Sequence, residues 1–341
     1  MNIAPERSAR EPAADRRRSD RAGTTQPRPG APTTRPRETP LPVRIEWPTV
    51  ALAVAIYGGF AALTWWYRAL PWWVVLPLGA YLVAWHGSLQ HEVVHGHPTP
   101  WAWVNELLVL PSLWLWLPFR LYRESHLRHH NDDSLTDPVA DPESYYVTAA
   151  RWAGLGAVGR AFLWTRNTVA GRLLLGPIHD TARLYASEAG RMIRGDGRNL
   201  RAWAWHGLGC AIVLGWVVGA CRVPVPEYIA LFAYPGLALT LLRSFLEHQA
   251  RPAVGERTVI VESGFLFSLL YLNNNLHVLH HLRPGAPWYA LPRLYRQLRA
   301  DLLARNGGHV IHGYWRVLAR YLLRPKECPV HQTALSGAPA G

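Results

Sequence analysis

Sulfur-containing side chains and lysines are scarce in this chain of 341 residues. It has three cysteines, Cys210, Cys221 and Cys328, and two methionines, and Lys326 is its only lysine. An odd number of cysteines without a Cys-x-x-Cys spacing argues against a small scaffold held together by disulfides. Charged residues are also few, at 17% of the chain, and several long stretches contain none at all.

These uncharged stretches argue against a purely soluble enzyme. Residues 47–67 and 69–90 lack Asp, Glu, Lys and Arg and are separated only by Arg68, and residues 202–221 form a third stretch. Each is long enough to cross a hydrocarbon core of about 30 Å as a helix. Residues 228–242, interrupted by Pro235, follow as the return partner of the third. The sequence therefore predicts four transmembrane helices, although the mean hydropathy of −0.04 resembles that of a soluble protein.

Residues 98–119 are apolar and rich in tryptophan, but they contain Asn105, Glu106 and a central Pro111. We expect a re-entrant or interfacial helical hairpin bent at Pro111, because a full crossing here would disturb the charge distribution described next. Residues 258–272 are apolar but short for a crossing. The predicted fold class is an all-α integral membrane protein with four transmembrane helices, this re-entrant or interfacial segment and a cytoplasmic helical cap.

The positive charges indicate how the chain lies in the membrane. The formal net charge is +13, and with four crossings all basic residues except Arg68 and Arg222 fall on one side. Cytoplasmic loops carry the excess of Lys and Arg, so this side and both termini are predicted to be cytoplasmic. The arginines flank apolar segments, which favours an anionic bilayer surface over nucleic acid as the partner. Without organelle signals, the bacterial inner (plasma) membrane is the expected location.

Three parts of the chain are expected. Residues 1–46 are rich in Arg and Pro and lack apolar periodicity, which is typical of a disordered tail. Residues 47–300 form the membrane domain, and residues 301–341 form a C-terminal cytoplasmic tail.

Eight of the sixteen histidines occur in three short clusters. These are His91-Glu-Val-Val-His95, His126-Leu-Arg-His129-His130 and His277-Val-Leu-His280-His281. Helical neighbours at i, i+3 and i+4 share one face, so each cluster can direct two or three imidazoles at one point. The predicted topology places all three clusters at the same membrane face. Eight imidazoles are too many for one ion and fit two, and imidazole ligands alone do not identify the metal.

Some polar residues near the clusters are expected to support the metal ligands. Metal-bound histidines usually donate their second ring N–H to a carboxylate or carbonyl. Asp133, Asp137, Asp141 and Asn274 are candidates for this role, and turn or cap formation is the equal alternative. The arginines at 151, 160, 166 and 172 are expected to form an interfacial face rather than a substrate site.

The three clusters resemble the histidine boxes of the integral-membrane di-iron fatty acid desaturases and hydroxylases. The resemblance extends to Asp137-Pro, to Asp141-Pro-Glu143 and to the Pro-Trp288-Tyr-x-Leu-Pro292 segment, and it covers residues 47–299. It implies two iron ions, O2 as co-substrate and an acyl-lipid or acyl thioester substrate. It also implies His248 as a ninth ligand, and no catalytic residue beyond the metal ligands.

The same resemblance leaves the reaction open, because hydroxylases and carotenoid ketolases share similar boxes. Desaturation of an acyl chain is the favoured prediction. The tails are too short for a fused cytochrome b5 module, so electrons are expected from a separate ferredoxin- or cytochrome b5-type protein. A remote alternative is an intramembrane zinc protease, since His91-Glu92-x-x-His95 is also the zinc-protease motif. That alternative leaves the other two clusters unexplained.

Overall fold

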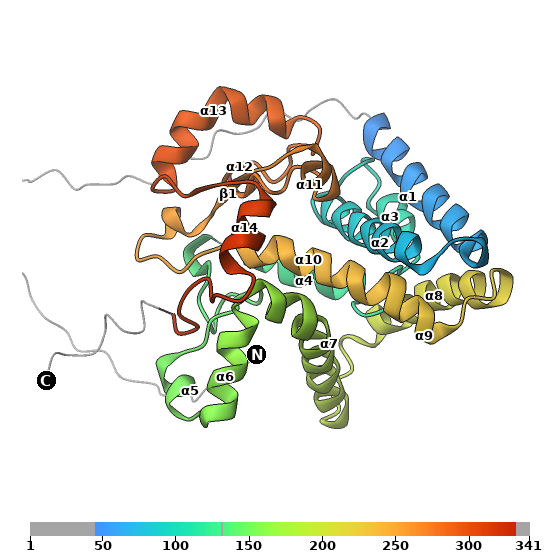
Figure 1. The fold of residues 1–341 in the computed structure, drawn as a ribbon, viewed down its shortest axis with the longest axis horizontal. Helices are drawn as coiled ribbons and strands as arrows, with labels where there is room; N and C mark the ends of the chain where they lie inside the picture. Colours follow the sequence, from blue (N-terminus) through green and yellow to red (C-terminus); the bar gives the residue numbers. More distant parts are fainter. Residues whose placement is uncertain (1–44, 131, 332–341) are drawn as a thin grey trace, which may run out of the picture. The chain divides into compact units, whose positions relative to one another are not determined.

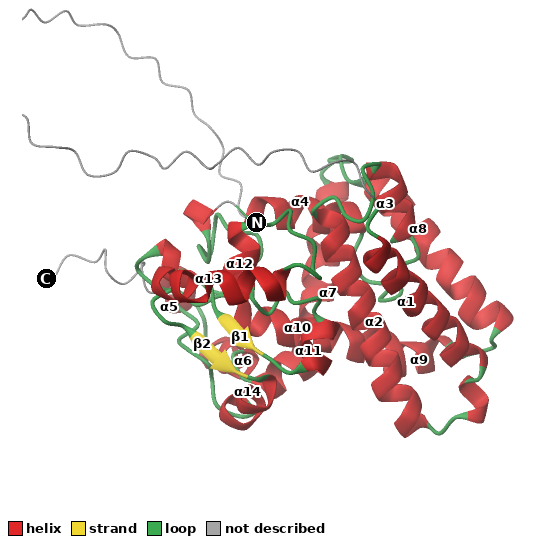
Figure 2. Cartoon of the chain, turned by 90° about the horizontal axis from the view of Figure 1, so that it is seen from above, coloured by secondary structure: helices red, strands yellow, loops and turns green. Residues whose placement is uncertain are grey.

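The computed structural model describes residues 45–130 and 132–331. The predicted disordered tail lies outside the described residues except for its last two positions, and so do residues 332–341. The described chain is mostly helical, and Figure 2 shows α1, α2, α8 and α9 together in one bundle. The first two of these helices, α1 (Trp47–Trp65) and α2 (Trp72–Val94), are joined by a single short turn, as the uncharged stretches predict.

The second pair of long helices is formed by composite elements. Helix α8 (Leu200–Leu214) continues through a π-helical turn over Gly215–Ala220. After a short loop, α9 (Val225–Tyr228), a second π-helical turn (Ile229–Ala233) and α10 (Tyr234–Glu247) form one continuous helix. Pro235 cannot donate a backbone hydrogen bond to the preceding turn, and the π-helical turn lies directly before it, where such a gap is accommodated.

Three helices are long and apolar enough to cross a membrane, namely Trp47–Trp65, Leu200–Ala220 and Val225–Glu247. They correspond to three of the four predicted crossings. Helix α2 is as long as the longest of them, but its tryptophans, Pro77 and His86 reduce its hydropathy and it is not among the three. The fourth crossing stays a prediction.

Helices α2 and α10 pack closely at Gly236. A Cβ atom built on Gly236 would lie 2.5 Å from the Cβ of Val83, so only glycine permits this approach. Small residues at such crossings let helix backbones come close together inside a membrane. This contact brings the last turn of α2 beside the last turn of α10.

The prediction of a helical hairpin over residues 98–119 is wrong in its second arm. Only α3 (Ala102–Leu108) is helical, and residues 109–118 form an irregular segment before α4 (Phe119–His129). Pro111 and Pro118 interrupt the helical hydrogen bonds. Two backbone carbonyls here accept hydrogen bonds from tyrosine hydroxyl groups of neighbouring helices instead. Tyr57 donates to the Leu108 carbonyl, and Tyr228 donates to the Leu113 carbonyl.

The remaining elements lie at the histidine-bearing end of the long helices (Figure 1). They are α5 (Ala149–Ala153), α6 (Ala157–Arg166), α7 (Val169–Ile193), α11 (Phe265–Leu270), α12 (His277–Leu282), α13 (Leu291–Arg305) and α14 (Tyr314–Tyr321), with short 3-10 turns at Asp132–Ser134 and Val254–Arg257.

The all-α prediction missed a two-stranded parallel sheet of β1 (Ile260–Glu262) and β2 (Val310–His312). Ile260 and Val261 are β-branched and buried, which suits a strand.

The C-terminal part of the described chain is held against the rest. The boundary predicted between residues 300 and 301 falls inside α13, and β2 pairs with β1 in register Ile260 to Val310. Near the end, the Val147 N–H donates to the Pro329 carbonyl and the Lys326 ammonium donates to the His248 carbonyl at 2.7 Å. The three-part division of the chain stays a prediction.

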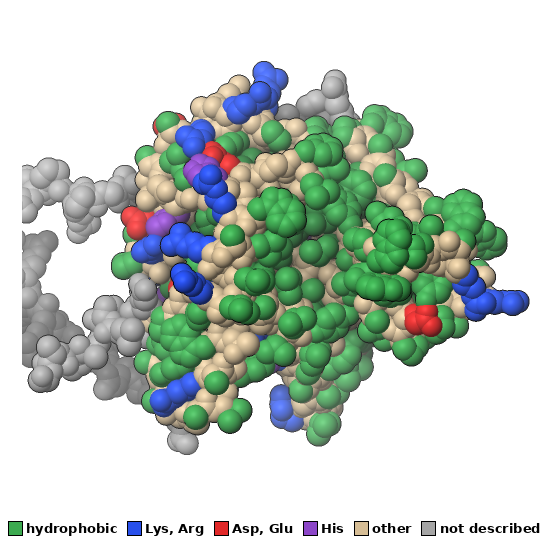
Figure 3. Space-filling model, viewed as in Figure 1, with side chains coloured by type: hydrophobic (Ala, Val, Ile, Leu, Met, Phe, Trp, Pro, Cys, Tyr) green, Lys and Arg blue, Asp and Glu red, His purple; other side chains and the backbone are tan. Residues whose placement is uncertain are grey.

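The kind of side chain that is exposed differs between two halves of the described structure. In Figure 3, hydrophobic side chains cover the half that contains α1, α8 and α9, and most charged side chains on this face gather over the half with α13 and α14. Four tryptophans around the α1–α2 turn are exposed: Trp65, Trp66, Trp72 and Trp73. Tryptophan is enriched at membrane–water interfaces, so this turn fits an interfacial position.

Candidate metal centre

Histidines from four helix segments lie in one region. The first cluster lies in the last turn of α2 and the second in the last turn of α4, where i, i+3 and i+4 positions share a face. The third cluster is helix α12 itself, and His248 directly follows α10. The predicted convergence of three clusters that are distant in sequence is therefore present in the structure.

The first group consists of His91, His95, His126 and His280. Their ligand nitrogens all lie within 4.8 Å of one another. His130 adjoins this group, because its Nε2 lies 3.0 Å from Nε2 of His126 and 3.0 Å from Nε2 of His280.

The second group consists of His129, His248, His277 and His281, again with ligand nitrogens within 4.8 Å. Nε2 of His248 lies 2.8 Å from Nε2 of His129 and 2.9 Å from Nε2 of His277. The His130 ring stacks on the His281 ring with centroids 4.4 Å apart, so the two groups are adjacent. All nine predicted ligands thus lie in the two groups or between them, while metal binding by each remains a prediction.

Hydrogen bonds at Nδ1 determine which nitrogen of each ring is available. Nδ1 of His129 lies 2.9 Å from Oδ1 of Asp141, and Nδ1 of His277 lies 3.1 Å from Oδ1 of Asn274. Nδ1 of His248 faces the Arg257 carbonyl at 3.4 Å. Because these oxygens accept, each Nδ1 carries the proton, and each Nε2 is left to bind a second proton or a metal ion.

The distances between Nε2 atoms fit a metal better than hydrogen bonds. Burial lowers the pKa of His277 well below its ordinary value, with further lowering by His248 and His281, so its Nε2 keeps a lone pair. That lone pair faces the equally unprotonated Nε2 of His248. Such lone pairs repel unless a cation lies between them. With metal–nitrogen bonds of about 2.1 Å, ligands at right angles lie about 3.0 Å apart, which matches the observed spacings. The donor set therefore fits metal ions.

Two acidic groups lie beside the second cluster, the buried Asp141 and the partly exposed Glu143. Burial raises the pKa of Glu143, but His126 and His129 outweigh this and lower it to about 2, so Glu143 is ionised at neutral pH. Burial lowers the pKa of His129, whereas Glu143 and the bonded Asp141 raise it to about 9. The local potential therefore favours positive charge at His129, whether as a proton or as a metal ion.

The predicted supporting residues have different positions. Asp141 holds His129 and also accepts the N–H groups of Thr136 and Glu143. Asn274 contacts His277, and its Nδ2 donates to Glu247 at 3.1 Å.

The two other aspartates have other surroundings among the described residues. Asp137 accepts the N–H groups of Val139 and Ala140, so it shapes a turn. Asp133 is exposed, and in the described residues no hydrogen bond joins it to a histidine. Their predicted role beside the ligands stays a prediction.

Sequence reasoning missed three charged residues at the site. Glu143 faces Nδ1 of His126 at 3.2 Å. Glu247 lies 3.5 Å from Nδ1 of His277 and is held by Arg243 at 2.8 Å. Glu247 directly precedes His248, and Arg243 lies one helical turn earlier on α10, so an i, i+4 ion pair beside a predicted ligand was the available signal.

Glu92 of the zinc-protease motif is bonded to a backbone group of another segment. Its Oε2 accepts the Trp288 N–H at 3.0 Å, and the side chain is buried. The neighbouring His91 and His95 are grouped with His126 and His280 rather than forming a separate two-histidine site.

The arginine face predicted along residues 151–172 is only partly exposed. Arg151 is exposed, but Arg166 and Arg172 are buried at 8% and 4% exposure. The prediction of an interfacial face is therefore wrong for these two residues, which line a pocket beside His248.

A sequence model of the fatty acid desaturase family matches residues 64–314. This range contains the three histidine clusters and His248, in agreement with the resemblance drawn from the clusters. No curated protein sequence matches the chain.

Proposed function

Because the chain belongs to the fatty acid desaturase family, we propose that it is an O2-dependent oxidoreductase that introduces a double bond into a fatty acyl chain. Membership makes it a membrane oxidoreductase with a lipid substrate. The observation that supports metal-dependent oxidation is the pair of adjacent histidine groups, in which Nε2 atoms face one another at 2.8–3.2 Å.

Two iron ions are the proposed occupants of these groups. His91, His95, His126 and His280, with His130 beside them, would hold one ion, and His129, His248, His277 and His281 the other. Iron would supply the O2 activation that breaking an unactivated C–H bond requires, since no amino-acid side chain can do this.

The chain's own residues orient the ligands and keep water away. Asp141 and Asn274 fix ring orientation through Nδ1, and Glu247 is itself anchored by Arg243. Most of the ligating histidines are buried, which shields the site from bulk water. Such fixed ligand orientation is what neighbouring hydrogen bonds provide in metal sites generally.

The proposed topology has four crossings, with α2 as the fourth, and both termini in the cytoplasm of a bacterium. The histidine groups then lie at the cytoplasmic ends of α2 and α10, where an acyl chain can enter from the bilayer. A ferredoxin- or cytochrome b5-type protein is the proposed electron donor. The basic residues of this side suit an acidic carrier.

Lipid mass spectrometry of an expressing host tests the proposal. We expect new unsaturated acyl chains with the wild-type chain and none with His130→Ala or His281→Ala. His312→Ala is the matched control, because His312 is exposed and lies outside both groups. New hydroxyl groups or altered carotenoids would instead assign hydroxylase or ketolase activity, and an unchanged lipid and pigment profile would contradict all three.

A further inference from the structure

We propose that a pocket beside the metal centre binds the anionic head of the lipid substrate through Arg172. The inference rests on the proposed function, because it names the class of substrate that this site would accept: a long-chain lipid with a carboxylate or phosphate head. The pocket has a cavity volume of about 40 Å³ and is partly open to solvent, so it has room for a small head group and not for an acyl chain.

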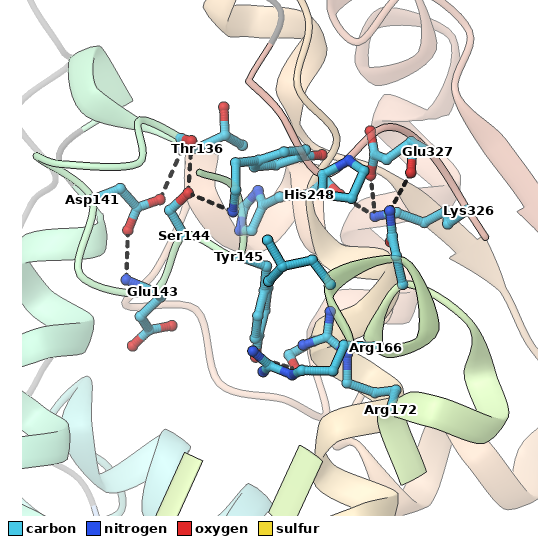
Figure 4. A pocket seen from close by; sticks show the side chains of 15 residues that line it. Thr136, Asp141, Glu143, Ser144, Tyr145, Arg166, Arg172, His248, Lys326 and Glu327 are labelled. Atoms are coloured by element: carbon cyan, nitrogen blue, oxygen red, sulfur yellow. Dashed lines mark hydrogen bonds and ion pairs between the residues drawn. The ribbon is translucent and has the colours of Figure 1, made fainter. Parts of the chain in front are cut away.

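The pocket adjoins the metal centre at one side and an arginine pair at another. Asp141, Glu143 and His248 line it, and so do Arg166 and Arg172 (Figure 4). In Figure 4 the two arginines lie together, away from Asp141.

The close contact between the end of α6 and the start of α7 explains this arginine pair. A Cβ atom on Gly171 would lie only 1.8 Å from the Thr165 carbonyl oxygen, so glycine is required there. Arg166 follows Thr165, and Arg172 follows Gly171.

Arg172 differs from the other cations of the pocket in having no directly bonded anionic partner, since Asp180 is bonded to Arg166 and acts on Arg172 only at longer range. Arg166 bonds Asp180 at 2.7 Å, and Lys326 bonds Glu327 at 2.7 Å. Among the residues that the structure describes, none makes a hydrogen bond or ion pair with the Arg172 guanidinium. Its Nε and Nη1 atoms are buried without any acceptor.

The surroundings of Arg172 hold its guanidinium in place without neutralising it. The group lies 3.7 Å from the centre of the Tyr145 ring, and the Tyr145 hydroxyl is bonded to Ser244 at 2.8 Å. A cation over an aromatic face is stabilised, but its N–H groups still need acceptors. A buried charge without a partner is strongly unfavourable, so the geometry points to an anion as the missing partner.

The carboxylates of Asp141 and Glu143 in the pocket already have histidine partners. Asp141 is bonded to His129, and Glu143 faces His126. An anionic ligand would be repelled from these two groups and attracted to Arg172. The head group therefore belongs at the arginine side of the pocket.

The outer surface of α7 indicates that the anion comes from a lipid rather than from solution. Leu174 and Ile178 are four residues apart on this helix and are 65% and 62% exposed. Apolar side chains at i and i+4 form a stripe that suits contact with the membrane interface. Arg172 lies on the same helix with its side chain buried, so a lipid head held by Arg172 stays close to the bilayer.

Equilibrium binding to the purified full-length protein in neutral detergent tests the proposal, and it requires no turnover. The probes are radiolabelled hexadecanoate, hexadecyl phosphate and the uncharged hexadecanol, with inorganic phosphate as a competitor. We expect Arg172→Met to weaken binding of both anionic probes at least about tenfold, because charge-assisted hydrogen bonds are lost. Hexadecanol binding stays unchanged, which also shows that the variant is folded.

Two further variants complete the test. Arg172→Lys keeps the charge without the planar fork and should fall between wild type and Arg172→Met. Arg183→Met is the matched control, because Arg183 is an exposed arginine on the same helix and should leave all affinities unchanged.

Three results would overturn the proposal. They are undiminished binding of the anionic probes by Arg172→Met, equal weakening of all three probes, and Arg172-dependent binding of inorganic phosphate without gain from an acyl chain. The binding measurement requires no turnover, so it can succeed when the lipid analysis finds no new double bonds. The lipid analysis can likewise succeed when Arg172→Met binds the probes normally, so the two proposals are judged separately.

Discussion

Nδ1 of His129 lies 2.9 Å from Oδ1 of Asp141, a buried carboxylate that also accepts two backbone N–H groups. The carboxylate is thereby fixed by its own loop and in turn fixes the ring. Loss of such a hydrogen bond typically lowers metal affinity 10–100-fold, so mutation of Asp141 is a direct test of the site.

Asp141→Leu should lower the affinity of the second histidine group for iron by about 10–100-fold. The expected cause is loss of the acceptor that orients His129, and titration of the metal-free protein with Fe(II) measures it. Asp137→Leu serves as the control, because Asp137 accepts backbone N–H groups of a nearby turn and makes no hydrogen bond to a histidine among the described residues. Equal affinities in both variants would contradict the role of Asp141.

Acidification should weaken metal binding. Imidazole binds a metal only with a free lone pair. Burial keeps the pKa of His277 well below its ordinary value, whereas Glu143 and Asp141 raise the pKa of His129 to about 9, so between pH 8 and pH 5 protons compete with the metal mainly at His129. Glu143, with a pKa of about 2, stays ionised at pH 5, so the loss comes from the imidazoles. Titration of the metal-free protein with Fe(II) at pH 8 and pH 5 should find weaker binding by the second histidine group at pH 5. Equal affinity of this group at both pH values would argue against ligation by His129.

Glu92→Gln and His280→Ala separate the proposed enzyme from a zinc protease. Glu92 accepts the Trp288 N–H, so its amide replacement should preserve most metal binding and lipid modification. His280 belongs to the first histidine group, so its removal should abolish product formation. Both are measured by metal content and lipid analysis. A protease would show the reverse pattern, with activity lost in Glu92→Gln and kept in His280→Ala.

Gly236→Ala should destabilise the bundle, because the new Cβ would collide with Val83. Overpacking of this kind typically costs about 1–3 kcal/mol, and thermal unfolding in detergent measures the loss. Gly58→Ala is the control, since Gly58 lies in α1 with nothing within 4 Å of an added Cβ. An unchanged midpoint for Gly236→Ala would show that α2 and α10 do not pack as described.

Arg68→Cys, in a variant without the three native cysteines, should react with a membrane-impermeant maleimide in intact cells. The proposed topology places the α1–α2 turn outside the cytoplasm. Arg324→Cys is the counterpart on the other side and should react only after the cells are permeabilised. Protection of both positions, or labelling of both, would refute the four-crossing arrangement.

The histidine clusters were predictable because helical spacing alone decides which side chains share a face. His126 and His129 are three residues apart and need no tertiary information to be paired. The supporting contacts were harder to predict, since the link from Asn274 to Glu247 joins residues of different elements. Nothing in the spacing of a single segment specifies such a pair.

The irregular segment over residues 109–118 and the burial of Arg172 show the same limit. Pro111 and Pro118 signal that a helix is interrupted, but the hydroxyl groups that satisfy the Leu108 and Leu113 carbonyls come from other helices. Arginine near a membrane usually lies at the interface, and only the packing of α7 against α10 places Arg172 inside. Long apolar helices follow from local composition, whereas buried charge depends on tertiary packing.

The bond from Lys326 to the His248 carbonyl bears on how the enzyme matures in the cell. The ribosome makes Lys326 long after all nine histidines, and the pairing of Val147 with Val330 also awaits this last stretch of chain. The backbone around His248 therefore gains its last supporting contacts only after residues 326–330 have been made. We expect stable metal binding only after this segment has folded against the rest of the protein.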